Sequence, residues 1–203
     1  MAEQKTRIKR ADTASMWVFS VLGIAIAGAT CVMAANRVFE FFRDAPVDVP
    51  VQFSGAESQI APGGGATYAL EIQTAIIQAE SLPAVAVVAG IAQAVILALV
   101  VVTIIFALLR LSVRAVRGDV FGKTSTLLVL VAGLTGLIGT VVAELLGGIL
   151  AIEAFAVAPA GMLSNVMVSL DVFPYIIAAF AVALIATVFG VGERLQRETE
   201  GLV

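Results

Sequence analysis

Gly122, Lys123 and Thr124 have the types and order that close a phosphate-binding loop, in which backbone amides surround the phosphates of a nucleotide. That motif requires another glycine five residues before Gly122, and this position holds Arg117. A long apolar run follows Thr124, whereas a phosphate-binding loop leads into a helix that packs on a sheet. We therefore expect no nucleotide site, and we interpret Gly118 as a turn residue and Lys123 as an anchor at the membrane surface.

Glu144 is the acidic residue that lies deepest inside an apolar segment, where carboxylates are costly and often functional. It follows Lys123 by about 31 Å along a helix, which places it near the outer boundary of a bilayer. By the same count from Arg110, Gln93 falls in the outer half of the preceding segment. The two side chains either line an outer cavity that takes a proton or a ligand, or share an interhelical hydrogen bond worth under about 2 kcal/mol. We favour the hydrogen bond.

Few other side chains offer chemistry. The 203 residues include no histidine, which removes the commonest metal ligand and general base. Cys31 is the single cysteine and lies in an apolar run, so we expect neither a disulfide framework nor a metal cluster. The net charge is −3, and no basic patch is large enough to indicate nucleic acid. We expect no enzymatic activity and no cofactor.

The composition indicates which elements position these residues. The chain is 60% hydrophobic and 13% charged, with a mean hydropathy of +1.04, whereas soluble domains are about a quarter charged. A membrane-spanning helix needs about 20 apolar residues. We expect an all-α integral membrane protein, a four-helix bundle with transmembrane helices at 15–35, 84–109, 126–152 and 172–191.

Lysine and arginine positions predict the orientation, because cytoplasmic segments carry an excess of both. Basic residues gather in segments 1–14, 110–125 and 192–203, whereas loop 36–83 has two and loop 153–171 has none. We expect both termini in the cytoplasm. The topology-determining residues of the central loop are Arg110, Arg114, Arg117 and Lys123.

The extracytoplasmic loop 36–83 is the connecting segment long enough to form a small module. Val47 to Phe53 alternates apolar and polar residues, which predicts a strand, and Pro50 would make it an edge strand. Thr67 to Thr74 alternates again, and the glycines after Pro62 predict a turn between the two. Two strands alone are marginal, so we expect support from the helix ends, a third strand or a partner.

Helix 126–152 carries small residues at spacing four, which lets helix backbones approach closely in lipid. Together with the polar pair, the expected packing residues are Gln93, Gly136, Thr140, Glu144 and Gly148. A neighbouring row holds Gly139, Ala143 and Gly147, and helix 172–191 has Ala178, Val182, Ala186 and Gly190. These rows form either seams within the bundle or an oligomer interface, and we favour the internal seams.

Gly118 and Phe121 form a Gly-x-x-Phe pattern before helix 126–152, and Gly192 and Leu195 belong to a pattern that follows helix 172–191. With four helices and a large first outer loop, the chain resembles an uncharacterised bacterial membrane family, domain of unknown function twenty-nine seventy-five. The resemblance implies structural roles for these four residues and a bacterial inner-membrane location. It also implies a cytoplasmic partner, because such proteins are often encoded beside a small helix-turn-helix regulator. The run 124–126 departs from the family, which more often has amide-bearing residues there.

Three functions follow as hypotheses. We expect a non-catalytic accessory or structural subunit of a larger membrane complex, in contact with lipid and with another membrane protein or a second copy. The first alternative is a membrane sensor whose outer loop responds to a signal and whose basic loop or tail holds a cytoplasmic regulator. The second alternative is a small oligomeric transporter or channel, with a polar path limited to Gln93, Thr103, Thr135, Thr140 and Glu144.

Overall fold

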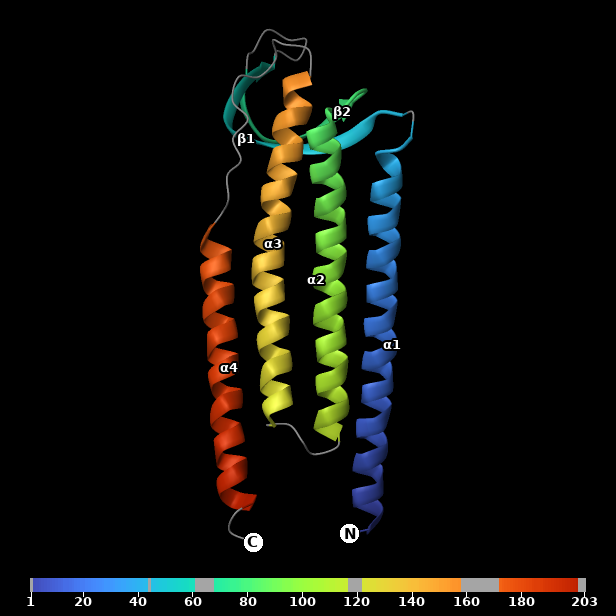
Figure 1. The fold of residues 1–203 in the computed structure, drawn as a ribbon, viewed down its shortest axis with the longest axis vertical. Helices are drawn as coiled ribbons and strands as arrows, with labels where there is room; N and C mark the ends of the chain where they lie inside the picture. Colours follow the sequence, from blue (N-terminus) through green and yellow to red (C-terminus); the bar gives the residue numbers. More distant parts are fainter. Residues whose placement is uncertain (1, 44, 61–67, 117–121, 158–171, 201–203) are drawn as a thin grey trace. The chain divides into compact units, whose positions relative to one another are not determined.

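The structure is a computed structural model that describes residues 2–43, 45–60, 68–116, 122–157 and 172–200 (Figure 1). Long helices dominate it, and one antiparallel hairpin separates the first two helices. In chain order the elements are α1 (Ala2–Glu40), β1 (Val47–Ile60), β2 (Tyr68–Ala79), α2 (Ala84–Val116), α3 (Lys123–Val157) and α4 (Val172–Glu200).

Each helix contains a stretch long and apolar enough to cross a membrane, as the sequence predicted. The spans are Trp17–Glu40, Ala84–Val116, Lys123–Val157 and Val172–Leu195. The 33 residues of α2 and the 35 of α3 measure about 50 Å, whereas the hydrocarbon core is about 30 Å thick. Both helices are therefore long enough to continue beyond the lipid.

The predicted loop 110–125 is too long. Arg110 and Arg114 lie within α2, which ends at Val116, and Lys123 is the first residue of α3. The apolar count stops at the first charged residue, but a helix does not need to stop there. Long basic side chains can extend to the polar surface while their backbone remains helical. Segments 1–14 and 192–203 are likewise helical through most of their lengths.

The chain divides into two compact units, and each is described by itself. The helix unit contains Met1–Ala34, Ile96–Thr140 and Val172–Val203. The hairpin unit contains Ala35–Val95 and Val141–Asp171. Helices α1, α2 and α3 are each divided between the two units, whereas α4 lies wholly in the helix unit.

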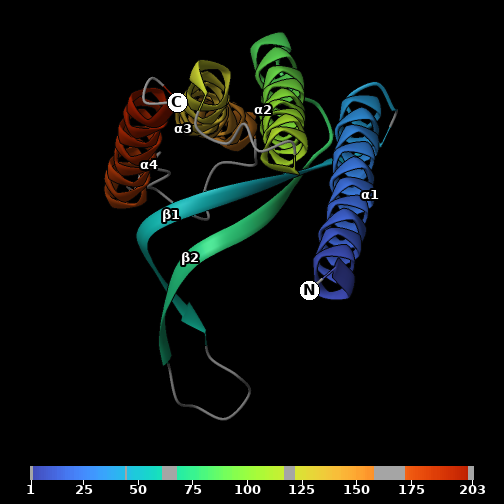
Figure 2. The ribbon, with the colours of Figure 1, turned by 90° about the horizontal axis from the view of Figure 1, so that it is seen from below.

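Neighbouring helices of the helix unit meet where glycines leave room. Gly23 of α1 faces Ile105 and Leu109 of α2, Gly136 of α3 faces Ile104 of α2, and Gly133 of α3 faces Val182 of α4. Within this unit, α1 and α4 occupy opposite ends of a row, with α2 and α3 between them (Figures 1 and 2).

A row of helices differs from the compact arrangement of many four-helix bundles in water. In water, helices close around a core because their apolar faces must leave the solvent. In lipid the outer faces already meet an apolar solvent, so closure brings no such gain. The burial agrees with the positions of the helices in the row. No residue in the most apolar stretch of α1 or α4 is buried, whereas part of the corresponding stretch of α2 and of α3 is buried.

The hairpin unit has a core of its own. In the base of the hairpin Val47 pairs with Ala79 and Val51 with Ala75, and the register shifts between Gln52 and Ala56. Alternate residues face inward, so Val49 and Val51 are fully buried. They form one cluster with residues of α2 and α3, namely Ala86, Leu150, Ala151 and Ala154. The predicted strands are confirmed and extend further than expected, and helix residues provide the support that two strands require.

Candidate functional site

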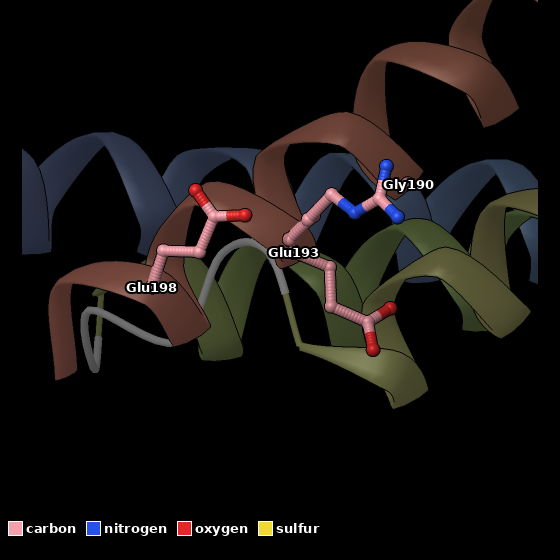
Figure 3. Close-up of a pocket in the computed structure, with 4 residues that line it drawn as sticks. Gly190, Glu193 and Glu198 are labelled. Atoms are coloured by element: carbon pink, nitrogen blue, oxygen red, sulfur yellow. The ribbon is translucent and has the colours of Figure 1, made fainter. Parts of the chain in front are cut away.

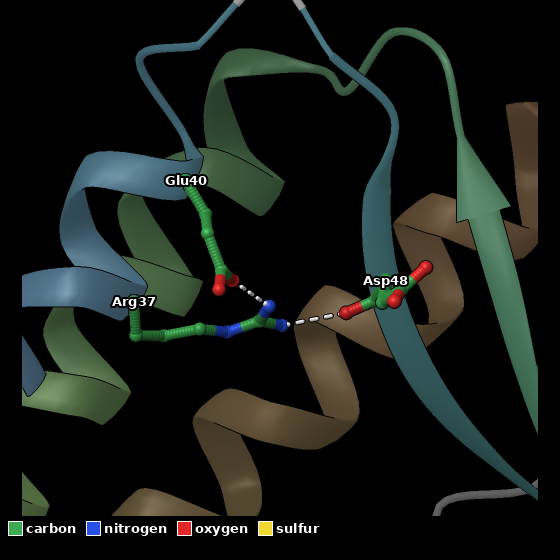
Figure 4. A network of polar contacts seen from close by, with 3 residues as sticks. All are labelled: Arg37, Glu40 and Asp48. Atoms are coloured by element: carbon green, nitrogen blue, oxygen red, sulfur yellow. Dashed lines mark hydrogen bonds and ion pairs between the residues drawn. The ribbon is translucent and has the colours of Figure 1, made fainter. Parts of the chain in front are cut away.

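A polar clasp joins the end of α1 to the base of the hairpin (Figure 4). The Arg37 guanidinium donates one hydrogen bond to the Glu40 carboxylate at 2.6 Å and another to the backbone carbonyl of Asp48 at 2.8 Å. It also lies 5.2 Å from the centre of the Phe41 ring, and that ring fills the space beside Gly90 of α2. One arginine therefore connects α1, β1 and the aromatic contact with α2.

Gln93 and Glu144, the expected polar pair, are not joined. Gln93 is half-buried on α2, and its amide lies against Gly147, where an added Cβ would come closer than 3.0 Å. Glu144 is exposed on α3, and Gly148 is half-buried. Within the described residues no hydrogen bond links Gln93 to Glu144. The depth count placed both residues in the same half of the membrane, but Gln93 lies level with Gly147, about 4.5 Å further along α3.

A hollow of about 510 Å³ lies in the helix unit where α2, α3 and α4 meet. Small residues of α3 create the space, and the first three turns of α4 form the opposite wall. The lining residues are Ile104, Ala132, Gly133, Gly136, Leu137, Thr140, Pro174, Tyr175, Ala178 and Val182. Gly136 and Thr140 were predicted as packing residues, and the structure places both on the wall of this hollow.

Intramembrane hydroxyls bond to their own helices. Thr140 donates to the carbonyl of Gly136 at 2.5 Å, Thr30 to Ile26 at 2.9 Å, and Thr187 to Ala183 at 2.8 Å. Such bonds satisfy a hydroxyl proton inside lipid without a partner on another helix. The hydroxyl proton of Thr140 is therefore donated within α3, and the hydroxyl oxygen can still accept a hydrogen bond.

The chain enters α3 at Gly122 and Lys123 through a hydrogen-bonded turn. The amides of Ser125 and Thr126 both donate to the carbonyl of Gly122, at 2.8 and 3.2 Å. These are the bonds of an ordinary first helical turn, and residues 117–121 before it lie outside the described part of the chain. Ser125 is fully buried, and the Thr126 hydroxyl oxygen is buried without a hydrogen-bond partner among the described residues.

The residues predicted to determine topology and those of the family pattern differ in how exposed they are, and some lie outside the described residues. Arg110 is exposed, with its guanidinium 4.9 Å from the centre of the Phe106 ring, and Lys123 is also exposed. Gly192 is half-buried and Leu195 is exposed on α4. Arg117, Gly118 and Phe121 lie outside the described residues.

A shallow hollow of about 390 Å³ lies beside the end of α4, lined by Gly190, Glu193, Arg194 and Glu198 (Figure 3). The carboxylates of Glu193 and Glu198 point in different directions. No ion pair joins Arg194 to Glu198 in the described part of the chain. This hollow has charged walls but no convergent set of ligands.

Sequence reasoning missed the contact face of α1. The residues Ser20, Gly23, Ala27, Thr30 and Ala34 are half-buried, whereas almost all their neighbours along the helix are exposed. They recur at alternating spacings of three and four, the pattern of a helix seam. The sequence contained a signal for this seam, because all five residues are small. Apolar residues occupy the other faces of α1 as well, so the seam does not stand out by hydropathy.

Comparisons with known proteins give no further guide: no family model, curated protein or solved structure matches the chain.

Proposed function

We propose that this chain is a non-catalytic subunit of a larger membrane complex, seated in a bacterial inner membrane with both termini in the cytoplasm. The observation that carries the proposal is the open row of the helix unit. Helices α1 and α4 lie at the two ends of the row. Their outer faces carry exposed large apolar side chains, including Trp17, Phe173 and Phe180. An edge helix of this kind can lie against lipid or against a helix of another subunit.

Two glycines favour another subunit. An added Cβ at Gly28 of α1 or Gly190 of α4 would meet nothing within 4 Å among the described residues, whereas Gly133 and Gly136 contact a neighbouring helix. A glycine inside a helix costs about 1 kcal/mol relative to alanine. Contact with lipid does not offset that cost. Packing against a second helix can offset it, because glycine lets two helix backbones approach closely.

The experiment is an affinity purification from native membranes in mild detergent, followed by mass spectrometry. The proposal predicts a set of membrane proteins at a fixed ratio to the chain. Gly28→Leu should release that set, because a large side chain then occupies the close-approach position. Ala29→Leu is the matched control, since Ala29 is exposed on α1 and points about 100° away from Gly28. Isolation of the chain alone from native membranes would contradict the proposal.

A membrane sensor is the second candidate, and the hairpin favours it. The base of the hairpin is fully buried at Val49 and Val51 against α2 and α3 residues, so movement of the hairpin would strain both helices. Recovery of a soluble DNA-binding regulator in the same purification would favour the sensor over the subunit. A transporter has less support, because the hydroxyl of Thr140 bonds within its own helix.

A further inference from the structure

The hollow between α3 and α4 has polar groups at one end only. Thr140 lies at the end of its α3 wall, and Tyr175 lies in the first turn of α4. The two helices run in opposite directions within the helix unit, so the late position on α3 and the early position on α4 fall at the same end (Figure 1). The rest of the lining is aliphatic, apart from backbone at the glycines.

Toward the opposite end the two helices approach closely. Gly133 touches Val182 so closely that a Cβ on the glycine would lie 2.5 Å from one valine methyl carbon. Ile104 of α2 forms the floor, 3.3 Å from the corresponding position at Gly136. The space is therefore an open apolar groove, called the slot below, that narrows away from a polar rim.

The rim lies toward the end of the slot at which the apolar span of α4 begins. A spanning helix begins near the boundary of the hydrocarbon core, and α4 begins at Val172, three residues before Tyr175. Tyrosine is enriched at that depth because its ring is apolar and its hydroxyl is wet. A molecule that fits the slot must be polar at the surface and apolar toward the membrane centre.

We propose that the slot binds one acyl chain of a glycerolipid, with the ester groups of the lipid level with Thr140 and Tyr175. The volume of about 510 Å³ lies within the usual range for small-molecule sites, about 300–1,000 Å³. The chain lies between Ala178 and Gly136, where both walls are small, and Val182 limits its depth. This site is independent of the subunit proposal, since it requires lipid and no other protein.

The test uses the purified full chain in nanodiscs containing phosphatidylglycerol with a diazirine in one acyl chain. Light attaches the probe to nearby residues, and peptide mass spectrometry locates it. The proposal predicts that label gathers on the lining residues of α3 and α4. Ala178→Trp, which fills the slot, should reduce that label about tenfold. Ala183→Trp is the matched control, an exposed alanine on another side of α4, and should leave the label unchanged.

Two results would overturn the proposal. Equal labelling around the whole of α4, with Phe180 and Leu184 modified as strongly as the slot, would mean ordinary surrounding lipid only. A slot that stays unlabelled while exposed residues react would mean that something other than lipid, such as a helix of a second copy, fills it. The unsubstituted chain gives this distribution directly, so the test does not depend on the folding of a variant.

Discussion

Gly133 of α3 packs against Val182 of α4 with no room for a side chain, and Gly133→Ala tests this contact. A Cβ at this position would lie 2.5 and 2.8 Å from the two methyl carbons of Val182 and 3.2 Å from its Cβ. Rotation of the valine cannot relieve all three contacts, because its Cβ does not move with the rotamer. The helices must therefore separate or shift.

The magnitude follows from two opposing effects. Overpacking costs about 1–3 kcal/mol, and replacing a helical glycine with alanine returns up to about 1 kcal/mol. We expect a net destabilisation of about 1–2 kcal/mol for Gly133→Ala. Gly190→Ala is the matched control, since an added Cβ there meets nothing within 4 Å among the described residues. Without a clash, it should be neutral or stabilising by up to about 1 kcal/mol in the isolated chain.

The assay is unfolding by a denaturing detergent, followed by energy transfer between labels on Cys31 of α1 and on a cysteine introduced at Ala183 of α4. A double variant sharpens the test. Val182→Ala removes both methyl groups, so combining it with Gly133→Ala should recover about 1–2 kcal/mol relative to the sum of the single changes. If Gly133→Ala proves as stable as Gly190→Ala, the two helices do not pack as described and the reasoning fails.

Three further predictions concern the hairpin and the orientation. Val49→Ala should destabilise the base of the hairpin by about 2 kcal/mol because Val49 is fully buried. Ile76→Ala, on the exposed face of the hairpin, should change its stability little. Equal hydrogen-exchange protection of the strand amides in the two variants would contradict the buried core. Arg37→Ala should lower the free energy of local opening at β1 by less than about 1 kcal/mol, seen as faster amide hydrogen exchange, since the Arg37–Glu40 ion pair is partly exposed. Arg37→Lys should not fully restore the protection, because one ammonium cannot hold both acceptors in the same geometry. In a Cys31→Ser background, an impermeant maleimide applied to intact spheroplasts should label Gln78→Cys and spare Glu198→Cys; the reverse pattern would invert the topology.

The sequence was a good guide to elements whose signal is local. Apolar length identified all four helices, and period-two alternation located the hairpin around Pro50 and Ile72. Boundaries were less accurate for a physical reason. Hydropathy measures where lipid ends, while hydrogen bonding decides where a helix ends, and α2 continues past Arg110 to Val116.

Contacts between helices could not be predicted from depth alone. The positions of Gln93 and Glu144 along their helices suggested a pair, but a shared depth leaves the rotation of each helix undetermined. In the structure Gln93 lies against Gly147, and Glu144 is exposed. A glycine offers a side chain room that its larger neighbours do not, so the position of Gly147 was the better guide to where the amide lies.

The small-residue rows show the same limit. On α4 the predicted row has spacing four, but the half-buried residues Tyr175, Ala179, Val182, Ala186 and Phe189 recur at three and four. Two helices that cross at a small angle keep contact along a spacing near 3.5, so a strict spacing of four drifts off the seam. Ala178 and Gly190 accordingly leave it and are exposed.

The exposed members of that row connect the packing of α4 to the two proposals. If the row served only the contact with α3, selection for packing would act on Val182 and Ala186, and small residues at Ala178 and Gly190 would bring no benefit. Ala178 lies on the wall of the slot, where a larger side chain would occupy the space for a lipid chain. Gly190 lies where an added Cβ would meet nothing within 4 Å in the described part of the chain, a position that suits the close approach of another helix. The two positions therefore make opposite predictions for lipid labelling: enlarging Ala178 should displace the lipid probe and retain protein partners, while enlarging Gly190 should do the reverse.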